Sequence, residues 1–248
     1  ARHVKRPVAL FLAPSAYLWG GVQTWLDQTA QGLRDRGWEI RLGLVAGPRH
    51  HDPAKYASAH PGHTVVRISC LTGTCEGRVR AVLRTLKAEQ PDLLVLVNIA
   101  DGLEAARRWK KSAKAPGFRV AYTIHAFLPG QIADIASFGG AVDRVVATNR
   151  LMERALGSVL GESPPIGYAP YGTEGPLAPD SPVERSPGPL RLAWVGRMEG
   201  AQKRTSDLVP ILHRCQELGV TFTCDIVGDG PSSEAVRNGL VELESDGK

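Results

Sequence analysis

Hydrophobic and polar residues follow two different patterns in the first part of the chain. The run Val8–Leu12 is continuously apolar, which predicts a buried strand. In the next stretch, six residues recur at intervals of three and four: Val22, Trp25, Leu26, Thr29, Ala30 and Leu33. That period places them on one face of a helix, which Gly37 is expected to end.

The alternation of strands and helices continues to about residue 156. Further strands are expected at Glu39–Val45, Thr64–Ile68, Leu93–Val97, Arg119–Ile124 and Arg144–Ala147. Helices are expected at Arg78–Glu89, Asp101–Lys111 and Asn149–Leu156, and Arg49–Gly62 is interpreted as a loop. Continuous apolar strands separated by helices are typical of a parallel sheet covered on both faces, so the sequence predicts an α/β fold.

The pattern changes after residue 175. Five prolines lie within 14 residues: Pro176, Pro179, Pro182, Pro187 and Pro189. Such a segment forms a stiff linker, so we expect domains at 1–175 and 190–248 joined by a linker at 176–189. The second domain is expected to have two strands and two helices, at Leu190–Val195, Thr205–Leu218, Thr221–Val227 and Ser232–Leu243. These roughly 60 residues are few for a doubly wound domain, so we expect the second domain to be incomplete.

Composition indicates an ordinary globular protein, with 43% hydrophobic and 22% charged residues among 248. No apolar run approaches the roughly 18 residues that a membrane-spanning helix needs, and we expect a cytoplasmic location. The cysteines Cys70, Cys75, Cys215 and Cys224 match no C-x-x-C or zinc-binding spacing. We expect free thiols, with a Cys70–Cys75 disulfide as the less favoured alternative.

Positive charge is concentrated in the first domain. Residues 1–186 hold 23 lysines and arginines against 16 acidic residues, whereas residues 187–248 hold 7 against 9. Basic side chains gather at 107–114 and, at helical spacing, at Arg80, Arg84 and Lys87. Solvated helix faces would explain them, and peripheral attraction to an anionic membrane surface or an acidic acceptor is the alternative. Nucleic acid is not expected as a partner, because no aromatic platform or binding motif accompanies the charge.

Candidate chemistry lies where the second-domain strands are expected to end, the edge at which open parallel sheets bind ligands. The strand Leu190–Val195 runs into Gly196 and Arg197, and Lys203 follows six residues later. Arginine binds two phosphate oxygens with its planar fork and lysine adds a compact charge, a combination that suits a diphosphate. The next strand runs into Gly228-Asp229-Gly230, interpreted as a turn that shapes a nucleotide cleft, with Asp229 capping the next helix.

The same rule selects residues of the first domain. Gly20 and Gly21 follow the first strand, where glycines can make a tight turn. His125 follows the strand Arg119–Ile124. A histidine there is either a structural residue or a catalytic one.

In this order, the pieces resemble the glycosyltransferases of family 4, which have two Rossmann-like domains facing each other across a cleft, the GT-B fold. The matching segments are Gly20-Gly21-Val22, Thr123-Ile124-His125, Val146-Ala147-Thr148-Asn149, Val195-Gly196-Arg197-Met198 with Lys203, and Ile226-Val227-Gly228-Asp229-Gly230-Pro231. The turn Tyr171-Gly172-Thr173-Glu174 matches in part, which makes Glu174 a weaker candidate. The resemblance implies that Gly20 and Gly21 form an acceptor or phosphate loop, that His125 is catalytic, and that Gly196, Arg197 and Lys203 hold the donor diphosphate.

The resemblance also implies the reaction. A sugar would move, with retention of configuration, from a nucleotide diphosphate donor to a glycan, lipid-linked or small-molecule acceptor. Because no Asp-x-Asp occurs, we expect fixed cations to stabilise the leaving diphosphate without a metal ion or other cofactor. Glu234 and Glu242 have the spacing of the family's Glu-x7-Glu motif, but they follow Pro231 too closely and are interpreted as a solvated helix face.

Three other functions stay open. A sugar-nucleotide 2-epimerase would use the same two-domain frame. A dinucleotide oxidoreductase is disfavoured, because no G-x-G-x-x-G follows the first strand. The chain could also be a non-catalytic fragment that binds a ligand or partner without turnover.

Overall fold

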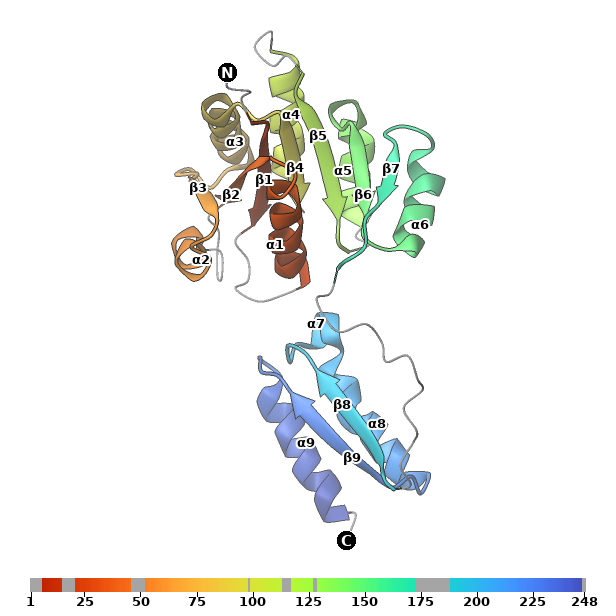
Figure 1. Cartoon of the computed structure of the whole chain (residues 1–248). Helices are drawn as coiled ribbons and strands as arrows, with labels where there is room; N and C mark the ends of the chain where they lie inside the picture. Colours follow the sequence, from red (N-terminus) through yellow and green to blue (C-terminus); the bar gives the residue numbers. More distant parts are fainter. Residues whose placement is uncertain are drawn as a thin grey trace. The chain divides into compact units, whose positions relative to one another are not determined.

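The structure is a computed structural model that describes residues 6–14, 21–45, 52–97, 99–112, 117–126, 129–172 and 188–246. The chain divides into two compact units, Ala1–Gly175 and Pro176–Lys248, which are drawn in Figure 1. Except for Gly188 and Pro189, the expected linker lies outside the described residues.

The first unit is built on a sheet of seven parallel strands. These are β1 (Val8–Pro14), β2 (Glu39–Val45), β3 (Thr64–Ile68), β4 (Leu93–Val97), β5 (Arg119–Ile124), β6 (Arg144–Ala147) and β7 (Ile166–Tyr168). Their order is β3-β2-β1-β4-β5-β6-β7, so that Ala9 of β1 lies opposite Ile40 of β2 on one side and Leu93 of β4 on the other. The strand order reverses beside β1, and open sheets of this kind bind ligands at such a switch point.

Helices cover both faces of this sheet (Figure 1). One face packs against α1 (Gly21–Arg34) and α2 (Pro53–Ala59). The other packs against α3 (Cys75–Glu89), α4 (Ala100–Lys110), α5 (Pro129–Phe138) and α6 (Arg150–Leu160), and a short 3-10 turn, η1 (Gly139–Ala141), follows α5. Trp25, Leu26 and Ala30 of α1 are buried against the sheet, which confirms the helix face expected from the sequence. Among the described residues, no helix has both the length and the apolar character needed to cross a membrane.

Three elements of the first unit were not expected from the sequence. The region interpreted as a loop at Arg49–Gly62 contains α2, whose N-cap Asp52 accepts hydrogen bonds from the backbone of Ala54 and Lys55. Helix α5 and strand β7 were also missed. Both α2 and α5 begin with a proline, which is favoured at the first helical position because that residue's N–H has no partner within the helix.

The second unit holds two parallel strands, β8 (Leu190–Val195) and β9 (Phe222–Val227). Its helical segments are α7 (Gly200–Lys203), the 3-10 turn η2 (Thr205–Asp207), α8 (Leu208–Glu217) and α9 (Ser233–Asp246). A helix was expected from Thr205, but α-type bonding begins at Leu208. The reason is that Pro210 has no N–H to donate to the carbonyl of Ser206.

The core of the second unit lies on one face of its two strands. Met198, Leu208, Leu212, Val236 and Leu243 are buried there, with Trp194 and Ile226 packed against them. On the alternate positions of the strands, Val195 is 73% exposed and Val227 is 58% exposed. The second face of this small sheet therefore carries apolar side chains without cover from the described residues.

Candidate functional site

Threonine hydroxyl groups fix the carboxyl ends of the central strands in the first unit. Thr123 of β5 donates its hydroxyl proton to the carbonyl of Leu96 in β4, at 3.1 Å. Thr148, directly after β6, donates in the same way to the carbonyl of Ile124 in β5, also at 3.1 Å. Both side chains are buried. These bonds join three neighbouring strands at the edge where the sequence placed its first-domain candidates.

His125 lies at the end of β5 and is held on three sides. Its Nε2 is 3.1 Å from Oγ1 of Thr123, and its Nδ1 is 2.7 Å from the hydroxyl oxygen of Tyr171. The edge of the Trp25 ring system packs against the imidazole, with ring centroids 4.7 Å apart. One residue from β5, one from α1 and one from the segment after β7 thus meet at this point.

The hydrogen bonds define which nitrogen of His125 carries the proton. Because the single hydroxyl proton of Thr123 goes to Leu96, Thr123 accepts from Nε2–H of His125. Nδ1 is then unprotonated and accepts the hydroxyl proton of Tyr171. Burial disfavours the imidazolium and lowers the pKa of His125 to about 4. His125 is therefore a neutral side chain at neutral pH.

Of the other first-domain candidates, Gly21 lies near the cluster of Trp25, His125 and Tyr171, and the rest are outside the described residues. Gly21 begins α1, and a Cβ added there would lie 3.6 Å from a ring carbon of Tyr171. Gly20 and Glu174 are outside the part of the chain that the structure describes. Tyr171 and Trp25 were not singled out as site residues. Tyr171 stands in the turn that matches the family only in part, and Trp25 carries the periodic signal of a core residue.

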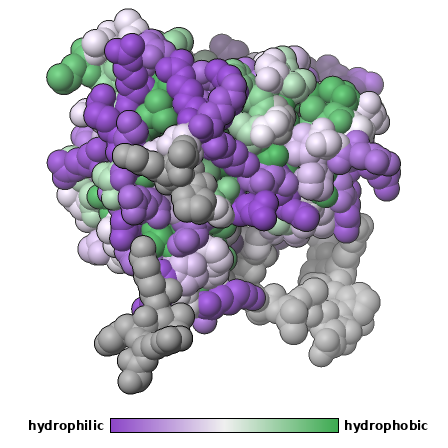
Figure 2. Space-filling view, turned by 90° about the horizontal axis from the view of Figure 1, so that it is seen from above, coloured by the Kyte–Doolittle hydropathy of each residue, from purple (hydrophilic) through white to green (hydrophobic). Residues whose placement is uncertain are grey.

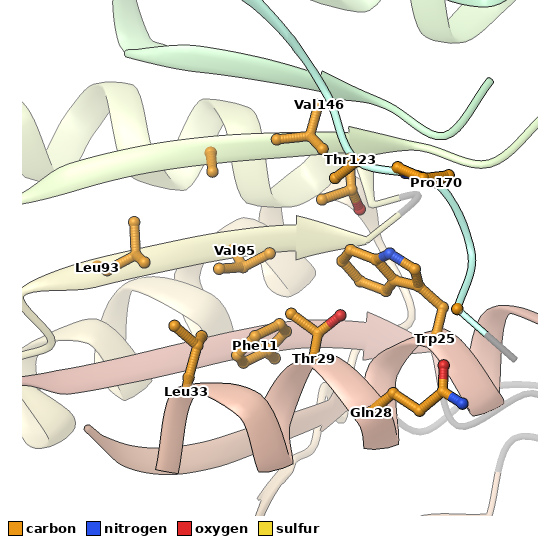
Figure 3. A pocket seen from close by; sticks show the side chains of 13 residues that line it. Phe11, Trp25, Gln28, Thr29, Leu33, Leu93, Val95, Thr123, Val146 and Pro170 are labelled. Carbon is orange, nitrogen blue, oxygen red and sulfur yellow. The ribbon is translucent and has the colours of Figure 1, made fainter. Parts of the chain in front are cut away.

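An apolar cavity of about 390 Å³ opens beside this cluster. It lies between α1 and the sheet, and the chain segment at 169–172 runs along its rim (Figure 3). Phe11, Trp25, Leu33, Val95 and Val146 line it, and Thr123 and Gln28 supply polar groups. The face of the sheet covered by α1 is therefore not fully closed over β5 and β6.

In the second unit, the two glycine-containing turns lie against each other. The backbone N–H of Gly196 donates to the carbonyl of Val227 at 3.0 Å, and that of Met198 donates to Asp229 at 2.9 Å. A Cβ on Gly228 would overlap the carbonyl oxygen of Gly196, and a Cβ on Gly230 would come within 2.5 Å of the carbonyl oxygen of Met198. Glycine is required at both positions because the two backbones touch.

Arg197 and Lys203 flank this junction. Arg197 follows β8, and its Nε lies 3.0 Å from Oε2 of Glu199. Lys203 is the last residue of the one-turn helix α7, and its side chain reaches towards Gly196, where an added Cβ would lie 3.8 Å from its Cδ. The two cations predicted to hold a diphosphate therefore lie near the same backbone turn, and Arg197 is ion-paired with Glu199.

Asp229 holds the second turn. Its Oδ1 accepts from the backbone N–H of Gly230 and from the hydroxyl of Ser233, both at 2.7 Å. The hydrogen bond from Ser233, followed by that from Gly230, lowers the pKa of Asp229. Asp229 therefore contacts the start of α9 through the hydroxyl of Ser233. The helix cap expected from the sequence is not formed, because neither of these two hydrogen bonds to Oδ1 comes from a backbone N–H of α9. Glu234 and Glu242 are exposed on α9, in agreement with a solvated helix face.

In the two basic groups noted in the sequence, four residues are paired with acids, namely Arg80, Arg107, Arg108 and Lys110. The ion pairs are Arg80–Glu76, Arg108–Glu76, Arg107–Glu104, Arg108–Glu104 and Lys110–Asp143. Hydrophilic side chains cover most of the face seen in Figure 2. Pairing reduces the attraction of these cations to an anionic surface, so the structure favours the interpretation as solvated helix faces. All four cysteines are free thiols, as expected.

Solved structures share this fold at low sequence identity. The chain superposes on the lipopolysaccharide outer core galactosyltransferase WaaB in its apo form with a TM-score of 0.66 and 18% identity, covering 96% of this chain and 65% of that one. A glycosyltransferase from Rickettsia africae superposes with a TM-score of 0.66 and 16% sequence identity, covering 98% of this chain and 65% of that one. A UDP-GlcNAc 2-epimerase from Neisseria meningitidis bound to UDP-GlcNAc superposes with a TM-score of 0.57 and 11% sequence identity, covering 98% of this chain and 70% of that one. The fold is that of the GT-B class, over the part that the chain spans.

The sequence itself places the chain within that class. The family model described as Glycosyltransferase Family 4 matches residues 19–172, which is more than half of the chain. The chain belongs to glycosyltransferase family 4. No curated protein matches it. The chain spans 65% of the length of the first two solved structures named above.

Proposed function

We propose that the protein transfers a sugar, with retention of configuration and without a metal ion or other cofactor, from a nucleotide diphosphate donor to a glycan, lipid-linked or small-molecule acceptor. The observation that carries the proposal is the family 4 match across the unit that contains His125 and Gly21. Residues 1–175 would bind the acceptor, and residues 190–248 would bind part of the donor.

The reaction would proceed on one face of the sugar. An acceptor hydroxyl oxygen forms a bond to the anomeric carbon as the bond from that carbon to the diphosphate oxygen breaks. The hydroxyl proton passes to the departing diphosphate, which leaves with the nucleotide. No enzyme nucleophile is needed in this route.

Arg197 and Lys203 would stabilise the departing group. Negative charge develops on the diphosphate oxygen in the transition state, and fixed cations lower the barrier most where charge develops. Arg197 would exchange its carboxylate partner Glu199 for phosphate oxygens, which are equally suited to the guanidinium fork. The touching turns at 196–198 and 228–230 would fix the backbone below the diphosphate.

His125 would contact the substrate as a neutral hydrogen-bonding group. Its Nε2–H is committed to Thr123, so the atom available to a ligand is Nδ1 after the hydroxyl of Tyr171 has moved away. Nδ1 could accept a hydrogen bond from a sugar hydroxyl. Gly21 would let the same ligand approach the start of α1.

The roles of the two cations can be tested by substitution. Arg197→Ala and Lys203→Ala should each lower turnover about 100-fold or more and weaken calorimetric binding of the nucleotide diphosphate, as removal of one transition-state donor does elsewhere. Arg214→Ala is the matched control, because Arg214 is an exposed cation of the same unit that pairs with Glu217. Unchanged kinetics in both site variants would refute their assignment, and turnover that requires added Mg²⁺ or Mn²⁺ would refute metal-independent transfer.

A 2-epimerase is the second candidate, because the fold also matches a solved epimerase that holds UDP-GlcNAc. The two functions differ in their products. A transferase releases free nucleotide diphosphate only when an acceptor is present, whereas an epimerase changes the donor sugar without an acceptor. Calorimetry with UDP, GDP and ADP would also reveal a chain that binds nucleotide without turnover.

A further inference from the structure

An aspartate and two histidines that lie more than 30 residues further along the chain converge between α1 and the turn that follows α2. Asp27 comes from α1, His60 is the C-cap residue of α2, and His63 lies just before β3. Nε2 of His63 is 2.8 Å from Oδ1 of Asp27, and Nδ1 of His60 is 3.8 Å from Oδ2. One ligand atom from each residue lies within 4.8 Å of the others. These side chains line a polar pocket of about 400 Å³.

We propose that Asp27, His60 and His63 bind a divalent transition-metal ion of the zinc class. Two imidazole nitrogens and one carboxylate oxygen form a donor set typical of these ions. Bonds of about 2.0–2.2 Å place tetrahedral ligand atoms roughly 3.4 Å apart, so side-chain adjustments without a change of fold would complete the site. Three protein ligands leave a fourth position for water. The proposal does not depend on the proposed function.

The surroundings hold the carboxylate in place. Gln23 donates from Nε2 to Oδ1 of Asp27 at 2.9 Å, and the hydroxyl of Tyr56 donates to the same oxygen at 3.2 Å. Oδ2 faces His60, whose ring stacks on that of Tyr56 with centroids 4.4 Å apart. Such outer contacts orient ligands before the ion arrives. The side chain of His63 is only 9% exposed, which limits its alternative positions.

The guanidinium of Arg34 is the neighbouring group that disfavours metal binding at His63. Its Nη2 is 2.7 Å from Nδ1 of His63, and a guanidinium can only donate. Nδ1 is therefore an acceptor, and the proton of His63 sits on Nε2, facing Asp27. A metal on Nε2 requires that proton to move to Nδ1, where it conflicts with Arg34. Arg34 must swing away, so replacing it should strengthen metal binding, whereas replacing a ligand should weaken it.

The test uses the untagged full chain, with its cysteines alkylated so that thiolates cannot bind zinc. Zn²⁺ binding is measured by calorimetry, and Co²⁺ binding by visible absorption, which reports coordination geometry. We expect one ion per chain. His63→Ala and Asp27→Asn should weaken the affinity roughly 10–100-fold or more. Arg34→Gln should strengthen it several-fold. His213→Ala is the matched control, because His213 is an exposed histidine paired with Glu217 on α8.

Circular dichroism checks that each variant is folded. The Arg34→Gln variant gives a second check, because unfolding of the chain could not strengthen metal binding. Equal affinity in the wild type, Asp27→Asn and His63→Ala would overturn the proposal. Absence of stoichiometric binding to both the wild type and Arg34→Gln would also overturn it. An affinity that falls as much in His213→Ala as in His63→Ala would show nonspecific histidine binding instead.

Discussion

At the scale of single residues, His125 illustrates how a partly buried side chain makes stability depend on pH. A histidine in an unfolded chain has a pKa of about 6.5, whereas burial lowers the pKa of folded His125 to about 4. Between these values the unfolded chain binds more protons, so the free energy of unfolding falls as the pH drops from about 6.5 to about 4. Above about pH 6.5 both states are neutral and the effect vanishes.

We expect His125 to account for a loss of about 1–3 kcal/mol over that pH range. Urea unfolding of the wild type and His125→Gln at pH 7.5 and pH 4.5 measures the difference. The variant should lose less stability than the wild type, because its side chain does not titrate. His213→Gln, an exposed control, should behave as the wild type does. Identical pH dependence in wild type and His125→Gln would contradict the burial of a neutral imidazole.

Gly228 tests the contact between the two turns of the second unit. A Cβ there overlaps the carbonyl oxygen of Gly196, which is backbone and cannot rotate away. We expect Gly228→Ala to lower the free energy of unfolding of this unit by about 1–3 kcal/mol. Gly200→Ala serves as the control, because its Cβ would meet nothing within 4 Å and alanine favours the helix. Denaturant unfolding measures both, and equal stability of the two variants would contradict the contact.

At the scale of elements, six of the seven strands of the first unit could be predicted from the sequence, whereas α2, α5 and β7 could not. The predicted ranges of β2, β3, β4, β5 and β6 agree with the structure, because each range is rich in the apolar and β-branched residues that favour strands. Strand β7 has three residues, too few to show a period. Helix α2 has seven, and its best signal was the Asp52-Pro53 pair at its start. Sequence spacing also could not reveal the Asp27, His60 and His63 cluster, since the fold joins positions 27 and 60.

The start of α6 gives a prediction for a single element. Asn149 is its N-cap, and its Oδ1 accepts from the backbone N–H of Met152 at 2.8 Å. We expect Asn149→Ala to lower the free energy of unfolding by about 1 kcal/mol, because that N–H loses its partner. Asn238→Ala is the control, since Asn238 is an exposed residue inside α9. Thermal unfolding should separate the two variants, and a stable Asn149→Ala would argue against the cap.

At the scale of the whole molecule, the two units differ in how well their sheets are covered. In the first unit, β1 and β4 are central strands that carry buried side chains on both faces. In the second, β8 and β9 form a pair with one exposed face, on which Val195 and Val227 lie among polar residues. Local opening is easier where few side chains are buried.

We therefore expect backbone amides of β8 and β9 to exchange with solvent about tenfold or more faster than those of β1 and β4. Hydrogen exchange followed by mass spectrometry measures this in the intact chain. The helices give an internal control, because Leu212 of α8 is as buried as Val82 of α3. Equal protection of the two pairs of strands would show that both units open together.

Helix α1 has a consequence for engineering the protein. Trp25 packs against His125 and lines the apolar cavity together with Leu33, whereas Asp27 faces the two histidines, so two parts of the helix surface contact different neighbours. Libraries that randomise α1 would disturb several of these contacts at once, and a gain in one property would be masked by losses in others. Side chains on the exposed face of α9 make fewer such contacts, so this face is a better place to attach labels or surface tethers.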